Sequence, residues 1–138
     1  MSKILMEGKN LTVAYDEPKN QLFLTWNGFL NSTDFREAAR EVIRAVEQTK
    51  ATAILSDNTN WKTISPNDRG WAAYNWFPEA EAKGVKKLAT VLSRDYFNRI
   101  SQKSIEALAD VRCMEVKNFN TIEEAQNWLS NSKTPACA

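Results

Sequence analysis

The sequence predicts an α/β domain with a mixed, mostly parallel sheet of four to five strands, an N-terminal β-hairpin and four helices packed on the sheet. Two observations predict this class. Apolar and polar residues alternate over residues 11–26, as in paired antiparallel strands. Farther along, short apolar runs alternate with segments of helical periodicity, an order that favours parallel strands joined by helical crossovers.

The hairpin is indicated by its turn as well as by its strands. Leu11, Val13 and Tyr15 alternate with polar or small residues, residues 16–20 have the composition of a turn, and alternation resumes over residues 22–26. For residues 1–10 two alternatives stay open, because this segment either pairs with the edge of the hairpin or remains loose.

The first helix is expected after Asn27-Gly28, with Ser32 or Thr33 as its N-cap. Charged residues occupy the positions between its apolar ones, which is typical of a solvated face. The residues predicted to face the core are Phe35, Ala38, Ala39, Val42 and Val46.

A second helix is expected to begin at Ser65, which caps it, with Pro66 in the first turn and Asp68 completing a capping box. Pro78 is expected to kink or end this helix. Its composition is unusual, because four large aromatic residues fall within seven positions. They are Trp71, Tyr74, Trp76 and Phe77.

The rest of the chain continues the alternation of strands and helices, and it shows no internal repeat. A capping box at Thr121-Ile122-Glu123-Glu124 predicts the start of the last helix. We interpret residues 1–131 as a single domain and residues 132–138 as a disordered polar tail. The other expected elements are buried strands at 53–55 and 88–92, a last strand at 111–116, a polar loop at 58–63 and a helix at 95–109.

Composition excludes several classes of function. The net charge of the 138 residues is about +1, so we expect no nucleic-acid partner, and no apolar stretch is long enough to span a membrane. Histidine is absent, which removes imidazole chemistry and makes a zinc site improbable. We therefore expect no metal, no cofactor and no enzymatic activity. The two cysteines, Cys113 and Cys137, are expected to form no framework disulfide, which suggests a reducing, cytoplasmic location.

The order of these segments resembles the SpoIIAA-like family, a bacterial branch of the STAS fold related to CRAL-TRIO lipid-binding domains. The resemblance spans roughly residues 10–130. It rests on Trp26-Asn27-Gly28 before the Phe35-Arg36-Glu37-Ala38 helix, on Leu55-Ser56-Asp57, on the stretch from Ile64 to Lys86, and on the stretch from Phe119 to Leu129. It implies a mixed sheet with helices and no catalysis. Anti-sigma factor antagonists carry an Asp-Ser-Ser-Gly-type phosphorylation motif where this chain has Ile64-Ser65-Pro66-Asn67, so only Ser65 is a candidate phosphorylation site.

A first candidate site lies where the parallel strands end. Ligands of open α/β sheets usually bind beyond the carboxyl ends of the strands. Asp57 and Asn58 follow one predicted strand, Arg94 follows the next, and Ser65 opens a helix whose free N–H groups favour an anion. The same residue types are also those that helix caps and turns require, so a purely structural role remains the alternative.

A second candidate site is the aromatic helix. Trp71, Tyr74 and Phe77 share one face, Trp76 points elsewhere, and Trp61 in the preceding segment is able to join them. These rings either pack in the core or meet a ligand or partner. The leading hypothesis is a protein-interaction or regulatory module, including a homodimer. The alternatives are a binder of a small apolar or lipid-like ligand, and a phosphoswitch at Ser65.

Overall fold

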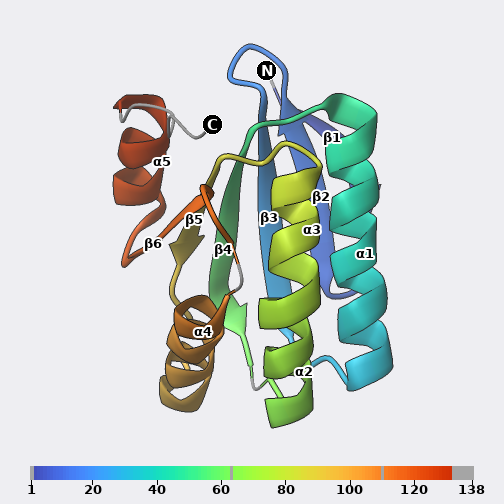
Figure 1. Ribbon diagram of the computed structural model, residues 1–138, viewed down its shortest axis with the longest axis vertical. Coiled ribbons are helices and arrows are strands. Elements are labelled where there is room, and N and C mark those ends of the chain that lie inside the picture. Colours follow the sequence, from blue (N-terminus) through green and yellow to red (C-terminus); the bar gives the residue numbers. More distant parts are fainter. Residues whose placement is uncertain (1, 63, 110, 132–138) are drawn as a thin grey trace.

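The computed structural model describes residues 2–62, 64–109 and 111–131. Within these ranges six strands form one mixed sheet in the order β1-β2-β3-β4-β5-β6 (Figure 1). β1, β2 and β3 pair antiparallel, whereas β3 to β6 pair parallel. The strands are β1 (Ser2–Glu7), β2 (Leu11–Asp16), β3 (Gln21–Gly28), β4 (Ala53–Trp61), β5 (Lys87–Val91) and β6 (Glu115–Phe119). The additional strand is β1, in which Ile4 pairs with Ala14, so the segment before the hairpin takes the paired alternative.

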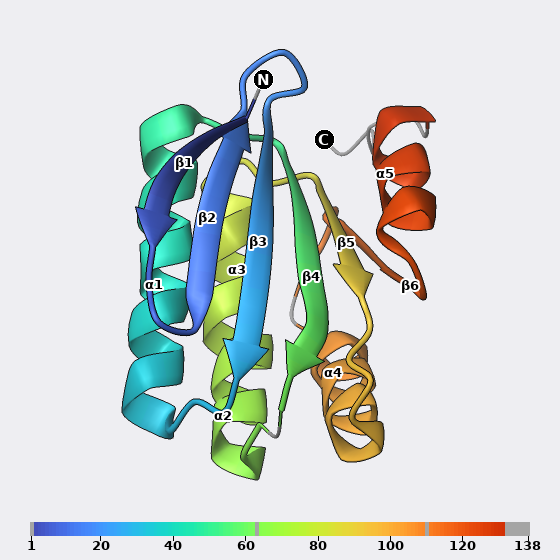
Figure 2. The same cartoon turned by 180° about the vertical axis from the view of Figure 1, so that it is seen from behind.

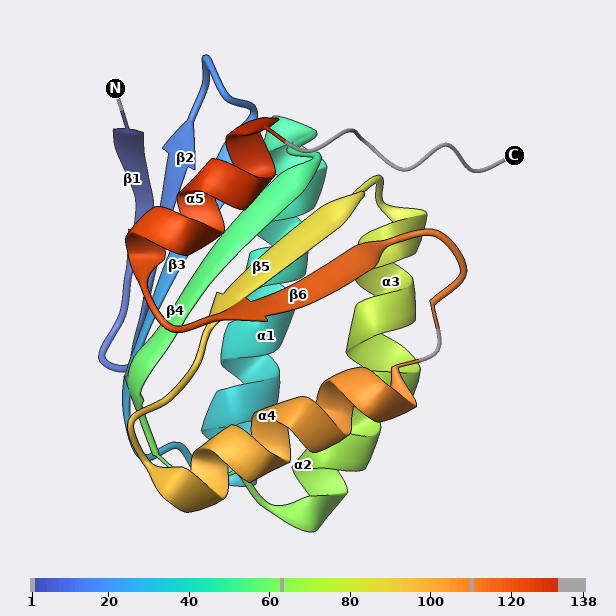
Figure 3. The ribbon, with the colours of Figure 1, turned by 90° about the vertical axis from the view of Figure 1, so that its left-hand side faces the viewer.

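The helices cover both faces of the sheet (Figures 1 and 3). α1 (Ser32–Thr49) and a long helix made of α2 (Pro66–Trp71), η1 (Ala72–Trp76) and α3 (Phe77–Ala82) cover one face. α5 (Ile122–Asn131) covers the other, and α4 (Tyr96–Leu108) packs beside α2. With α2–η1–α3 counted as one, these are the four predicted helices, and the α/β class is confirmed. The predicted tail, residues 132–138, lies outside the described residues.

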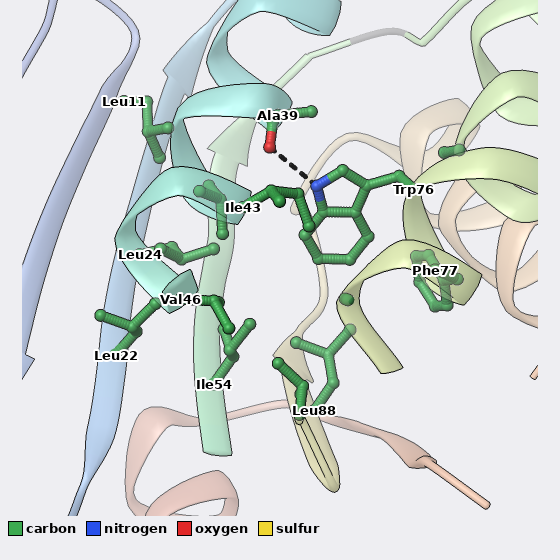
Figure 4. Packing of buried hydrophobic residues seen from close by; sticks show 14 of the residues in the cluster. Leu11, Leu22, Leu24, Ala39, Ile43, Val46, Ile54, Trp76, Phe77 and Leu88 are labelled. Atoms are coloured by element: carbon green, nitrogen blue, oxygen red, sulfur yellow. Dashed lines mark hydrogen bonds between the residues drawn. The ribbon is translucent and has the colours of Figure 1, made fainter. Parts of the chain in front are cut away.

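The core consists of two hydrophobic clusters, one on each face of the sheet. The larger lies between the sheet, α1 and the α2–α3 helix, and Figure 4 shows part of it. The smaller lies under α5 and contains Leu55, Ala89, Val91, Ala125 and Leu129. Side chains of a strand alternate between faces, which is why Ile54 belongs to the first cluster and its neighbour Leu55 to the second. Figure 2, from behind, shows α5 at the β5–β6 side of the sheet, where it contacts β4, β5 and β6, with β1 to β3 left uncovered by a helix.

Pro78 does not end the second helix. The turn before it is π-helical, and the N–H of Phe77 bonds to the carbonyl of Ala72, five residues earlier. In an α-helix the ring of Pro78 would clash with the carbonyl of Tyr74, and Pro78 has no N–H to donate. The wider π turn accommodates the proline, so the helix continues to Ala82.

Several predicted boundaries are wrong. The expected polar loop at 58–63 belongs largely to β4, because Asn60 and Trp61 pair with Asn27 and Gly28 of β3. The last strand is 115–119 instead of 111–116. The N-cap of α1 is Asn31, whose side chain accepts a hydrogen bond from the N–H of Asp34. For the two strands, pairing with a neighbouring strand outweighs the local apolar pattern.

The loop before β6 is tied to α3 by one carboxylate. The side chain of Glu81 accepts hydrogen bonds from the backbone N–H groups of Arg112, Cys113 and Met114, at 3.0, 2.6 and 2.7 Å. Burial raises the pKa of Glu81, but the three N–H groups together hold it below its usual value. Cys113 itself is disulfide-bonded, so the expectation of no disulfide is wrong. That expectation was the argument for a reducing compartment, and the cytoplasmic location stays a prediction.

Glu81→Gln should lower the free energy of unfolding by about 2 kcal/mol at pH 7, because hydrogen bonds to a charged acceptor are worth about 1.5–3 kcal/mol. The folded pKa lies below the unfolded value of 4.5, so this contribution is present above pH 4.5 and disappears as the pH falls through the folded pKa. Urea unfolding at pH 7 and pH 3 measures it. The control is Glu79→Gln on the same helix. Because the side chain of Glu79 is exposed, this substitution should change the free energy of unfolding very little. Equal losses in both variants would contradict the assignment.

Candidate ligand-binding cavity

A cavity of about 70 Å³ lies between the sheet, α1, η1 and α4. Aromatic rings supply much of its wall: Trp26, Phe35, Trp61, Trp76 and Phe77. Its polar lining residues are Ser56, Asn58, Thr90 and Glu106. Because the cavity extends from the middle of β3, β4 and β5 toward their carboxyl ends, it reaches the sheet end where ligands of open α/β folds bind.

The aromatic wall is held by ring contacts and one hydrogen bond. A register shift between Thr25 and Asn27 of β3 accompanies the stacking of Trp26 on Trp61, with centroids 4.4 Å apart and planes 10° from parallel. Phe35 lies 5.4 Å from Trp61. The indole N–H of Trp76 donates to the carbonyl oxygen of Ala39 at 2.8 Å, which fixes this ring against α1 (Figure 4).

A row of polar side chains crosses the sheet beside the cavity. Ser56, Thr90 and Asn118 occupy paired positions on β4, β5 and β6, so their side chains share one face. At the β4 end, the indole N–H of Trp26 donates to Oγ of Ser56 at 3.1 Å, and Ser56 donates to Oδ1 of Asn58 at 2.6 Å. At the other end, Thr90 and Asn118 both hydrogen-bond to the carboxyl group of Glu106 on α4.

Glu106 is the titratable group of the cavity. Burial raises the pKa of Glu106 to about 7, although the hydrogen bonds from Asn118 and Thr90 and the charge of Lys103 lower it. The carboxyl is therefore about half ionised at neutral pH. The Oδ1 atom of Asn118 is buried and has no hydrogen-bond partner among the described residues. Glu106 thus lines the apolar cavity, and Asn118 hydrogen-bonds to it from outside the lining.

The predicted residues divide between this cavity and other places. Asn58, Trp61, Trp76 and Phe77 line it. Asp57 precedes Asn58 on β4 and so points to the opposite face, where its carboxylate accepts from the N–H of Thr59 at 3.1 Å. The side chain of Arg94 is exposed beyond β5. The structure therefore does not bring the sheet-end residues together in one anion site.

Ser65 belongs to the junction between α1 and α2. Its hydroxyl accepts from the N–H of Asp68 at 3.2 Å and donates to the Asp68 carboxylate at 2.9 Å, which confirms the predicted cap. Asp68 is only 2% exposed, and it also accepts from Ser32 at 2.8 Å and from Arg36 at 3.1 Å. These bonds connect the first turns of the two helices.

The aromatic helix shows less ring surface to solvent than its composition suggests. Trp76 and Phe77 are buried, and Trp71 is half-buried with its ring edge-on to Phe35 at 5.9 Å. The guanidinium carbons of Arg36 and Arg40 lie 5.3 and 5.6 Å from the Trp71 ring. Tyr74 is 57% exposed. The exposed part of this helix is therefore a small patch of Trp71 and Tyr74, bordered on α1 by two arginines.

Comparison with known proteins places the fold. A family model described as SpoIIAA-like matches residues 22–130. This chain belongs to the SpoIIAA-like family. A solved structure, an uncharacterized protein of the DUF3478 family with a SpoIIAA-like fold from Shewanella loihica PV-4, is similar with a TM-score of 0.53 and 16% sequence identity. The similarity covers 94% of this chain and 92% of that one, and it concerns the fold. A search of curated proteins found no match.

Family membership supports, in general terms, a regulatory or interaction module for this SpoIIAA-like chain. Among the residues that the structure describes, no helix is both long and apolar enough to cross a membrane. The same residues contain no group of three or more acidic or cysteine side chains placed to hold a metal ion.

Several lining residues of the cavity in this SpoIIAA-like chain were not among those predicted from sequence: Trp26, Phe35, Ser56, Thr90 and Glu106. A signal was available for two of them. Ser56 and Thr90 interrupt strand segments that are otherwise apolar, Ala-Ile-Leu-Ser and Leu-Ala-Thr-Val-Leu, and a buried polar side chain needs a partner. Nothing local distinguishes Glu106 from the other charged residues of its helix.

Proposed function

We propose that this SpoIIAA-like chain is a non-catalytic binding module that holds a small, mainly apolar ligand in the aromatic cavity. The observation that carries the proposal is the cavity itself. Protein interiors are close-packed, and their few voids are rarely larger than a water molecule. About 70 Å³ is several times the roughly 10–15 Å³ that one water requires. A mostly apolar pocket with a few converging polar groups is the usual form of a small-molecule site.

The polar groups of the cavity favour binding over catalysis. Glu106 is the one acid or base among the lining residues. A general base acts on a nucleophile or an acidic proton within hydrogen-bond reach. Of the two lining residues with a hydroxyl group, Thr90 hydrogen-bonds to the Glu106 carboxyl and Ser56 donates to Asn58, so both hydroxyls are engaged within the protein. The lining residues therefore support recognition of a ligand without a reaction step.

Filling the cavity should abolish binding of a small apolar probe. Ala72 lines the cavity from η1, and Ala72→Leu adds three carbons there. With benzyl alcohol as the probe and calorimetry as the measurement, we expect at least about a tenfold weaker affinity for this variant. Ile64→Phe fills the cavity from another wall and should have the same effect.

The matched control is Tyr74→Ala, on the same helical turn but exposed to solvent, which should bind the probe as the wild type does. Thermal unfolding verifies that each variant is folded. If the wild type binds neither benzyl alcohol nor ethylbenzene, or if the filled variants bind as well as the control, the proposal fails.

A second candidate function is partner docking, self-association included, at the surface patch of Trp71 and Tyr74 with Arg36 and Arg40. The specific observation in its favour is the exposed ring of Tyr74, three residues along the helix from Trp71, whose own ring contacts two arginines of α1. Tyrosine, tryptophan and arginine are the residues that dominate binding hot spots.

If this patch joins two copies of the chain, Tyr74→Ala should weaken the dimer by about tenfold or more in sedimentation equilibrium, because hot-spot truncations cost about 2 kcal/mol or more. Glu79→Gln, exposed on α3, is the control. A wild type that stays monomeric at high concentration, and captures no other protein through Tyr74, would exclude the patch as an interface.

Phosphorylation of Ser65 stays a prediction with a defined consequence. The Ser65 hydroxyl now donates to the buried carboxylate of Asp68. A phosphate there would repel that carboxylate and compete for Arg36, so it would disrupt the junction between α1 and α2. Intact mass of the protein isolated from its host tests for the modification, and finding only the unmodified mass under all growth conditions would remove the hypothesis.

A further inference from the structure

We propose that the cavity selects a ligand in which a protonated amino group is joined to a small apolar ring or chain, with the ammonium placed against the carboxylate of Glu106. This inference rests on the proposed function and specifies its ligand. The apolar part would lie against the tryptophan wall. The charged part would lie at the α4 side of the cavity.

The first argument is the charge of the lining. Glu106 is the one charged residue among the lining residues, and its other polar members are Ser56, Asn58 and Thr90. A buried carboxylate is costly unless an opposite charge accompanies it. Thr90 and Asn118 donate hydrogen bonds to Glu106 but carry no charge. Lys103 on the same helix attracts it, yet its side chain is exposed to solvent, which screens the attraction.

The second argument is the remaining hydrogen-bonding capacity beside Glu106. Asn118 hydrogen-bonds to Glu106, while its own Oδ1 atom is buried without a partner in the described part of the chain. An ammonium group has three N–H donors and no acceptor, so it suits the carboxyl oxygens of Glu106, which lines the cavity, and Asn118 lies behind that carboxyl. A carboxylate ligand would meet repulsion at the same place.

The third argument is the aromatic wall. Tryptophan rings offer large apolar faces, against which the ring or chain of the ligand packs while its ammonium lies at Glu106. Trp26, Trp61 and Trp76 all line this cavity. The indole N–H groups of Trp26 and Trp76 are already bonded, to Ser56 and Ala39, so their rings contribute π surface without an unsatisfied donor.

Three molecules of nearly equal shape test the charge preference: benzylamine, benzyl alcohol and ethylbenzene. Calorimetry at pH 8 compares the wild type with Glu106→Gln. In the wild type we expect benzylamine to bind about tenfold or more tightly than ethylbenzene, and in Glu106→Gln we expect this preference to vanish while ethylbenzene binds as before or better. Glu37→Gln on α1, exposed and outside the cavity, is the control that should keep the wild-type preference.

A second measurement is the number of protons released when the amine binds. At pH 7 Glu106 is about half protonated, so an ammonium that binds beside it should displace up to about half a proton per ligand. Titrations in buffers of different ionisation enthalpy measure this release, which Glu106→Gln should abolish.

The outcomes separate this inference from the proposed function. If all three probes bind the wild type equally, or if Glu106→Gln keeps the preference for benzylamine, the amine inference is overturned and the apolar cavity stands. If none of the three binds, the proposed function fails and the inference fails with it.

Discussion

Glu106→Gln should stabilise the ligand-free chain by about 3 kcal/mol at pH 8. The pKa of Glu106 is about 7 in the folded chain against an ordinary value of 4.5, and each pKa unit corresponds to about 1.4 kcal/mol. At pH 8 the folded wild type therefore holds an ionised carboxyl that burial disfavours. Glutamine keeps the shape and one acceptor oxygen without the charge, so the variant avoids this cost.

The sign of the pH dependence follows from proton binding. Between pH 4.5 and pH 7 the folded state keeps the Glu106 proton that the unfolded state has already lost. The contribution of Glu106 is thus fully present below pH 4.5, falls as the pH rises to about 7, and levels off above. Urea unfolding at pH 4.5, 6 and 8 measures the change. The free energy of unfolding of Glu37→Gln should have the same pH dependence as that of the wild type. If Glu106→Gln also has the wild-type pH dependence, the raised pKa of Glu106 is contradicted.

Asp68→Ala should lower the free energy of unfolding by about 3–4 kcal/mol. Asp68 is almost completely buried and accepts hydrogen bonds from Ser32, Arg36 and Ser65 at 2.8, 3.1 and 2.9 Å. Its removal leaves a half-buried guanidinium and two hydroxyls without their acceptor. Removing one partner of a buried charge pair typically costs about 3–5 kcal/mol.

The control for Asp68→Ala is Asn67→Ala, the preceding residue of α2, whose side chain is exposed. Chemical unfolding of both variants at pH 7 measures the difference. Because Asp68 connects the first turns of α1 and α2, hydrogen exchange should also accelerate at the start of both helices in Asp68→Ala. A loss no larger than that of Asn67→Ala would show that the junction contributes little to stability.

Local sequence patterns were sufficient to predict the helix caps and the hairpin, because these features depend on residues close to one another in sequence. The helix start predicted at Thr121 is present: the Thr121 hydroxyl accepts from the Glu124 N–H at 3.1 Å and donates to the Glu124 carboxylate at 3.0 Å. The Ser65 cap and the β2–β3 hairpin were predicted in the same way. Each depends on interactions between residues close in sequence, so the residue types themselves carry the information.

The pairing of strands that are distant in sequence could not be predicted from local patterns. β4 continues through Asn58 to Trp61 because β3 lies beside it, although the segment is polar enough to suggest a loop. The same alternation along β4 places Asp57 and Asn58 on opposite faces of the sheet, so two residues expected to form one site are separated by the backbone. A register shift of one residue would have turned Asp57 toward the cavity and Asn58 away from it.

The sequence by itself determined the α/β class, the order of its elements, the caps of two helices and the concentration of aromatic residues after Ser65, because periodicity and capping are local properties. Only the tertiary structure decided which rings are buried, that a cavity remains beside them, and that Glu106 of α4 lies next to Thr90 and Asn118. The reason is physical: the raised pKa of Glu106 arises from burial by segments far apart in sequence, and no local pattern encodes the position of those segments.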